Sequence, residues 1–117
     1  MIPQNVLSAA YDAGRNSASI IYYLLKRGER SAWHRLKSPE TWIWLAGGRL
    51  RLTLGGTAPR PNAQGTFLLG SYSDKDADTH LTIAANVWQT AEMDCDDFVL
   101  VSCIMSPAFV PEDWELA

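Results

Sequence analysis

Cysteine, long apolar runs and, in the second half, basic residues are all scarce in this chain of 117 residues. Its cysteines, Cys95 and Cys103, are too few for a disulfide scaffold and lack a CxxC spacing. No apolar stretch reaches the roughly 18 residues that a membrane span needs. The first residues show no basic segment followed by an apolar one, so no secretory signal is visible. We therefore expect a cytoplasmic protein that does not insert into membranes.

The composition is that of one folded domain. Apolar residues make up 47% and charged residues 20% of the chain, which is outside the range of disordered proteins. The length suits a single domain with one core. Five tryptophans are many for this length, and so much indole usually lines a core or a pocket.

Charge is distributed unevenly along the chain. Residues 1–60 hold nine Lys and Arg against three acids, whereas residues 61–117 hold one lysine against ten acids. Strands from the two halves could interleave so that their surfaces attract, or the basic half could form a face for an anionic ligand or acidic partner. The first explanation is favoured, because Arg49 and Arg51 alternate with leucines as on a solvated strand face. Nucleic-acid binding is not expected, because no Lys/Arg cluster is interleaved with aromatics.

Short strands separated by turns dominate the pattern. Residues 49–54 alternate between polar and apolar, and the run at 19–25 is typical of a strand covered on both faces. Further strands are predicted at 41–46, 66–69, 81–83 and 98–105, and turns or loops at 27–29, 37–39, 47–48, 55–56, 59–62 and 92–97. Helix is limited to a weak candidate at 6–13 and a turn near 111–114. The prediction is an all-β domain, either a sandwich or a barrel.

One spaced set of residues suggests a site. Gly28, His34, Glu40 and Gly47 form the pattern G-x5-H-x5-E-x6-G across two strands and the turn between them. A turn containing Pro39 can return the chain so that the carboxylate of Glu40 lies beside the imidazole of His34. Imidazole with carboxylate is a donor set that suits a divalent transition metal.

This pattern resembles the first motif of the cupin superfamily, in which a second histidine and a later P-x-G-x2-H motif complete a metal site. Leu36 stands where that second histidine would be, and Gln89 stands at the histidine of the later motif. Gln is a much poorer metal ligand than His, which excludes a tight three-histidine site. Asn86 replaces the glycine of the later motif and is a tolerable substitute, because Asn adopts positive φ more readily than most residues.

The remaining segments are similar to those of one cupin branch, the DUF985 or cupin_5 family. They are I-Y-Y-L-L at 21–25, S-A-W-H-R at 31–35, S-P-E-T-W at 38–42, V-W-Q at 87–89 and the stretch from Phe109 to Leu116. The resemblance implies a single-domain cupin-type β-barrel, or jelly roll, over residues 17–117, preceded by an amino-terminal arm over 1–16. It also implies a homodimer, in which we expect residues 2–11 to lie in the interface.

Several charged residues of that family are missing. Ile2, Gln4 and Ile43 stand where the family usually has His, Glu and His. Each change removes a titratable group, which favours a small-molecule ligand less polar than a sugar. We expect no cofactor, although His34, Glu40 and Gln89 could hold a divalent metal weakly.

The resemblance and the strand pattern together give a set of candidate site residues. As catalytic residues we expect His34, oriented by Glu40, and whichever of Tyr22 and Tyr23 faces the interior. The candidates for ligand binding are Gln89, Leu36, Trp42, Trp44 and Trp88. Each could instead be an ordinary core residue, and Cys103 is expected to be inert packing.

Two classes of function fit these residues. The first is an enzyme that uses acid–base chemistry in the barrel pocket, of the isomerase, epimerase, cyclase or lyase type. The second is a module that binds a metabolite without turning it over.

Overall fold

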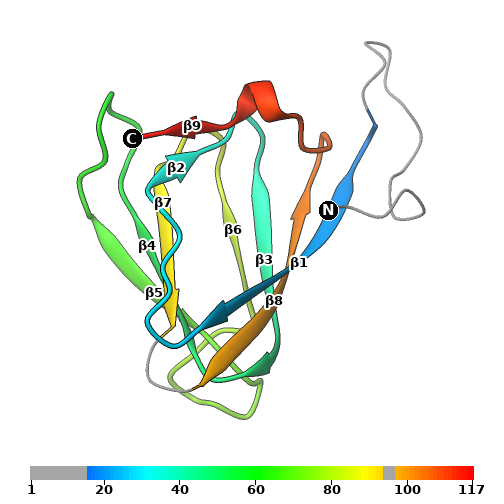
Figure 1. Ribbon diagram of the computed structural model, residues 1–117, viewed down its shortest axis with the longest axis vertical. Helices are drawn as coiled ribbons and strands as arrows, with labels where there is room; N and C mark the ends of the chain where they lie inside the picture. Colours follow the sequence, from blue (N-terminus) through cyan, green and yellow to red (C-terminus); the bar gives the residue numbers. More distant parts are fainter. Residues whose placement is uncertain (1–15, 94–96) are drawn as a thin grey trace.

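The computed structural model describes residues 16–93 and 97–117, and it shows an almost entirely β-stranded domain (Figure 1). Its longest strands are β1 (Ser19–Lys26), β3 (Glu40–Gly47) and β8 (Phe98–Met105). The shorter elements are β2 (His34–Arg35), β4 (Leu50–Leu54), β5 (Gly65–Leu69), β6 (His80–Ile83), β7 (Gln89–Met93), a 3-10 turn η2 (Pro111–Asp113) and β9 (Glu115–Leu116). The predicted all-β class and the predicted turn near 111–114 are confirmed.

The strands form two antiparallel sheets. One has the order β1-β8-β3-β6 and the other β5-β4-β7-β2-β9. Within the described residues the sheets are not joined into a closed barrel, and their arrangement is compatible with a jelly roll. The segment after β8 crosses from the first sheet to the second, where β9 pairs with β2 (Figure 1). This crossing places carboxy-terminal side chains over one end of the space between the sheets.

The core lies between the sheets. Along β4, Leu50 and Leu52 are fully buried whereas Arg51 is only partly so, as the alternation of the sequence predicts. Other large buried side chains come from both sheets: Trp42, Leu69, Ile83, Val99 and Val101. Full burial of one such aliphatic side chain contributes roughly 1.5–3 kcal/mol, so this layer holds the sheets together.

Strand β1 corrects one prediction. It is covered on only one face, because Ile20, Tyr22 and Leu24 point outward and are exposed. The β-branched and aromatic composition of 19–25 indicates a strand, but it does not reveal whether a second layer covers it. Among the described residues, strand β1 is the outer strand of its sheet and pairs only with β8.

Strand β7 corrects a second prediction. Residues 92–97 were expected to form an acidic turn, but Glu92 and Met93 belong to β7, and residues 94–96 lie outside the described part of the chain. The Glu92 carboxylate lies on the outer face, 2.6 Å from the Arg30 guanidinium, whereas Met93 is buried. In the sequence alone, acidic residues on the outer face of a strand cannot be distinguished from those of an acidic turn.

The uneven charge of the two halves is explained by ion pairs between them. Each of the shorter pairs joins a basic residue before position 60 to an acid after it: Arg27–Asp97, Arg30–Glu92, Arg35–Glu115 and Arg49–Asp74. Strands of the two halves alternate within both sheets, which brings their charged side chains together. The interleaving explanation is therefore confirmed.

Positive φ angles occur where the motif predicts them. Gly28 has φ of 85° and Gly47 has φ of 92°. A Cβ atom at position 47 would clash with the Phe98 carbonyl oxygen, so only glycine fits there. Asn86 also has positive φ, at 68°, which confirms that it takes over the conformation of a motif glycine.

The helix candidate at 6–13 and the interface segment at 2–11 lie outside the described residues. In the part that is described, no helix is long and apolar enough to cross a membrane.

Candidate functional site

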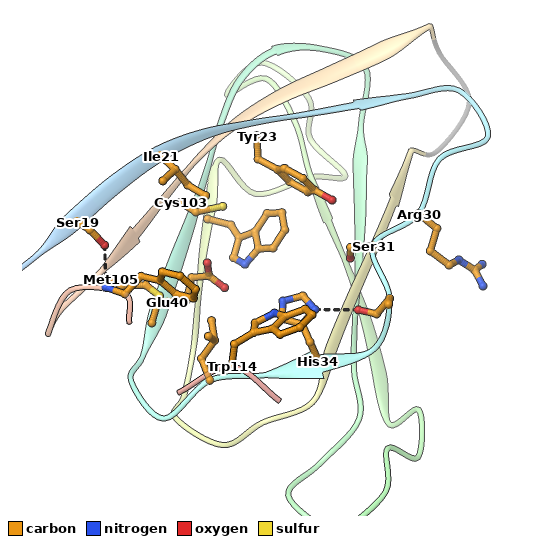
Figure 2. A pocket seen from close by; sticks show the side chains of 14 residues that line it. Ser19, Ile21, Tyr23, Arg30, Ser31, His34, Glu40, Cys103, Met105 and Trp114 are labelled. Atoms are coloured by element: carbon orange, nitrogen blue, oxygen red, sulfur yellow. Dashed lines mark hydrogen bonds between the residues drawn. The ribbon is translucent and has the colours of Figure 1, made fainter. Parts of the chain in front are cut away.

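A cavity of about 750 Å³ opens between the two sheets at the end crossed by the carboxy-terminal segment (Figure 2). Its size is in the range of small-molecule sites. Its lining is mostly apolar and aromatic, with a few polar groups. The lining residues are Ser19, Ile21, Tyr23, Arg30, Ser31, Ala32, His34, Leu36, Glu40, Trp42, Cys103, Met105, Phe109 and Trp114.

His34 enters the cavity from β2. Its Nδ1 atom lies 2.8 Å from the Ala32 carbonyl oxygen, and because a carbonyl only accepts, Nδ1 carries the proton. In the neutral ring Nε2 is then an acceptor, and it has no hydrogen-bond partner among the described residues. Burial lowers the pKa of His34, although the hydrogen bond to Ala32 opposes this shift. The ring is thus a neutral base at neutral pH.

Glu40 is the first residue of β3 and is only 7% exposed. Its Oε1 atom is buried and has no hydrogen-bond partner in the described structure. Burial raises the pKa of this carboxyl to about 6, while hydrogen bonding from the Gln89 and Trp42 side chains acts in the opposite direction. A buried polar atom without a partner costs free energy, and because Glu40 lines the cavity, a ligand of opposite charge beside its carboxylate can offset that cost.

The predicted partnership of His34 and Glu40 needs correction. The two side chains line the same cavity, but His34 is oriented by the Ala32 backbone and not by the carboxylate. The turn between β2 and β3 does bring both residues to one wall, with Leu36 between them in sequence. Sequence spacing therefore located both residues but not the group that fixes the imidazole.

Gln89 lies behind the cavity wall. It is 1% exposed and pairs with His34 across β7 and β2, but it is absent from the cavity lining. The Trp42 indole N–H donates to its Oε1 atom at 3.0 Å. Gln89 supports Glu40 and Trp42 from behind and does not contact the cavity, contrary to the predicted ligand-binding role.

The residues present do not fit a bound metal. Within the described residues, no three His, Cys, Asp or Glu side chains lie close enough to hold one. Leu36 is the cavity residue at the position of the second histidine of the cupin superfamily motif, and the oxygen of Gln89 already accepts the Trp42 hydrogen bond.

The two neighbouring tyrosines point to opposite faces of β1. Tyr23 lines the cavity, whereas Tyr22 points outward from β1 and is 74% exposed. The Tyr23 ring contacts Trp42 edge-on, with ring centroids 5.9 Å apart. Burial raises the pKa of Tyr23, so its hydroxyl keeps its proton at neutral pH. Tyr22 is therefore excluded from the cavity and Tyr23 remains a candidate.

Two of the predicted ligand-binding tryptophans lie elsewhere. Trp44 is half-buried and its indole N–H donates to the Gly48 carbonyl oxygen at 2.8 Å. Trp88 is fully buried and donates to the Ala58 carbonyl oxygen at 2.8 Å. Neither lines the cavity, whereas Trp42 does. Cys103 also lines it, and burial strongly raises the pKa of this thiol, so it stays unreactive.

Two aromatic residues of the carboxy-terminal segment were missed as site residues. Phe109 and Trp114 line the cavity, and the Trp114 ring lies 6.1 Å from the His34 ring. Both belong to the stretch from Phe109 to Leu116 that carries the resemblance, which was the available signal. The polarity of the stretch, with three acids, gave no indication that it covers a pocket.

Arg35 anchors this segment. Its guanidinium lies 3.0 Å and 3.2 Å from the two carboxylate oxygens of Glu115 and 4.4 Å from the centre of the Trp88 ring. It also donates to the carbonyl oxygens of Thr57 and Ala58. A guanidinium with several fixed partners holds β9 against β2, and so keeps Trp114 beside His34.

The family description "Cupin superfamily (DUF985)" matches residues 2–117 of this chain. The chain is a cupin of the DUF985 family. No curated protein matches it. Among solved structures, protein SO0799 from Shewanella oneidensis has a TM-score of 0.83 and 32% identity, over 95% of this chain and 69% of the other.

Two further solved structures show how widely this cupin fold is shared. A hypothetical protein from Leishmania major has a TM-score of 0.77 and 27% identity, over 96% of this chain and 74% of the other. A dTDP sugar isomerase from Desulfovibrio desulfuricans has a TM-score of 0.70 at 18% identity, over 84% of this chain and 62% of the other. At that identity the isomerase shows a common fold and does not show a common activity.

Proposed function

We propose that this cupin is an enzyme that moves a proton on a small organic ligand held in the cavity. The observation that carries the proposal is the state of His34: a neutral ring fixed through Nδ1, with Nε2 free in a cavity of about 750 Å³. A base held by a backbone group and open toward a ligand site has the geometry of general base catalysis. Its pKa, lowered from 6.5, keeps it unprotonated at neutral pH.

The mechanism divides the work among three side chains. His34 Nε2 takes a proton from a carbon next to a carbonyl group, and the electron pair of the broken C–H bond moves onto the carbonyl oxygen. The Tyr23 hydroxyl, which has no other hydrogen-bond partner in the described structure, donates to that oxygen. Glu40, which lines the cavity, holds another group of the ligand through its carboxylate. Return of the proton to a different carbon gives an isomerase, and return to the opposite face of the same carbon gives an epimerase. Loss of a leaving group from the carbon next to the deprotonated one, as the electron pair on oxygen moves back, gives a lyase.

The test begins with the ligand that the protein retains. Native mass spectrometry of gently purified protein should show an adduct, and the released compound is then incubated with the wild type and with His34→Gln. His80→Gln is the matched control, because His80 is exposed on β6 and outside the cavity lining. Turnover by the wild type and the control but not by His34→Gln is expected. A ligand that binds but is never converted would make the protein a binding module instead.

Three properties inferred with the function stay predictions: the homodimer, the cytoplasmic location and the absence of a tightly held cofactor. The neighbouring structures that are named as enzymes, such as the dTDP sugar isomerase, support a small molecule as the partner.

A further inference from the structure

Glu40 is an unusual group to find in this cavity. It is 7% exposed, its Oε1 atom has no hydrogen-bond partner in the described structure, and most of the surrounding wall is apolar. Leaving a buried carboxylate uncompensated is costly, and proteins normally pair such a charge. The partner must therefore come either from this chain or from a ligand.

The described part of the chain supplies hydrogen bonds from Gln89 and Trp42 to the Glu40 carboxyl, but no positive charge facing it at the cavity wall. Arg30 is the only Lys or Arg among the cavity-lining residues, and its guanidinium lies 2.6 Å from the Glu92 carboxylate. Figure 2 shows the Arg30 side chain pointing away from Glu40. The other titratable groups that line the cavity are His34, Tyr23 and Cys103, and none of them carries a positive charge at neutral pH.

Aromatic rings surround the same space. Tyr23 comes from β1, Trp42 from β3, and Phe109 and Trp114 from the carboxy-terminal segment. Figure 2 shows Tyr23, Glu40, His34 and Trp114 directed into a common space. The faces of such rings attract cations, and most strongly when water is excluded.

We infer that the cavity binds a small organic cation, a protonated amine or a quaternary ammonium, with Glu40 as its counter-ion and the aromatic rings around its alkyl groups. This inference names the ligand class of the site described above, so its catalytic meaning rests on the proposed function. An uncharged polyol suits the site less well, because each hydroxyl would need a polar partner and the wall offers few.

The aromatic rings and the Glu40 carboxylate contribute to ligand binding in different ways. Glu40 supplies the charge that a cation compensates, so its effect depends on the ligand's charge. The apolar wall accepts the alkyl groups of either a cation or a neutral molecule of the same shape. Comparing the affinities of a cation and of a neutral molecule of the same shape therefore separates the contribution of charge from general affinity for apolar ligands.

The test is a binding titration of the full-length protein with choline and with dimethylbutanol, its neutral isostere in which carbon replaces nitrogen. We expect choline to bind at least about tenfold more tightly than the isostere at a pH of about 8. Glu40→Gln should abolish this preference, and Glu112→Gln, at an exposed glutamate outside the cavity, should leave it unchanged. Trp114→Leu should reduce it, and this side chain is exposed enough for the variant to fold.

Equal binding of the two molecules, tighter binding of the isostere, binding of neither, or a preference that survives Glu40→Gln would overturn the inference. His34→Gln separates it from the proposed function, since this variant should keep the preference for choline. A wild type that prefers choline but never exchanges a ligand proton would contradict only the proposed function. Turnover of a neutral ligand without any preference for the cation would contradict only the present inference.

Discussion

The Trp42 indole N–H donates to the Oε1 atom of Gln89 at 3.0 Å, in the buried layer just behind the cavity. The hydrogen bond occupies the Gln89 side-chain oxygen, which is therefore not free to bind a metal. It also fixes the orientation of the Trp42 indole beside Glu40. Gln89 thus serves the site by supporting it. At a position where the cupin superfamily motif has a metal-binding histidine, this chain has a residue that supports the cavity wall from behind.

Metal content follows from this arrangement. The wild type, purified without chelators, is expected to hold well below one transition-metal ion per chain, as measured by elemental analysis. The double variant Leu36→His/Gln89→His introduces both missing histidines of the cupin superfamily motifs and should gain a metal. One tightly held ion per wild-type chain would show that His34 and Glu40 find a further ligand.

Glu40 should make stability depend on pH. Its pKa is about 6 in the folded chain against an ordinary 4.5, so the folded state binds its proton more tightly than the unfolded state. The free energy of unfolding then falls as pH rises through about 6, by about 2 kcal/mol in total. The Glu40→Gln variant should not show this fall in the free energy of unfolding. Urea unfolding should show the variant gaining about 2 kcal/mol over the wild type between pH values of about 4 and about 8.

The comparison of variant with wild type removes the opposing effect of His34, whose lowered pKa makes stability fall on acidification. Glu112→Gln is the control and should give a difference that does not vary with pH. A flat difference for Glu40→Gln would mean that its carboxyl is solvated.

Asn86 offers a test of the turn before β7. Its φ of 68° suits Gly and Asn, and its side chain is exposed, so a substitution there mainly tests the backbone. Asn86→Gly should leave stability near that of the wild type, whereas Asn86→Ala should lose about 1 kcal/mol. The midpoints of urea unfolding measure both. Equal midpoints for the two variants would contradict the conformational explanation.

Tyr22 and Tyr23 form a natural pair of variant and control, because they are adjacent on β1 and face opposite sides. Tyr23→Phe removes the hydroxyl proposed to bind the developing oxyanion and should lower kcat about 100-fold. Tyr22→Phe should leave kcat unchanged. Equal kcat for the two variants would remove Tyr23 from the mechanism.

The sequence predicted the elements whose signals are local. The alternation at 49–54 and the apolar run at 98–105 are strands, and the spacing of His34 and Glu40 places both residues at one cavity. Positive φ at Asn86 followed from its place at the glycine of the cupin motif together with the preference of Asn for that conformation. These features depend on side-chain period and backbone preference, which a single sequence shows directly.

The remaining features depend on contacts between distant segments. Only the three-dimensional structure shows that Gln89 is engaged by Trp42, that Arg35 fastens Glu115, and that Trp114 thereby lies beside His34. Their partners are 47 and 80 residues away for the first two contacts. No local pattern encodes such pairings, so the carboxy-terminal part of the cavity was not predicted.

The central claim, that His34 exchanges a proton with a bound ligand, is tested most directly by hydrogen–deuterium exchange. The retained ligand is incubated in D2O with the wild type, His34→Gln and His80→Gln, and deuterium at its carbon atoms is followed by mass spectrometry. The account predicts incorporation with the wild type and His80→Gln, and a rate lower by about 100-fold or more with His34→Gln. Equal rates for the wild type and His34→Gln, or no incorporation by the wild type, would contradict it.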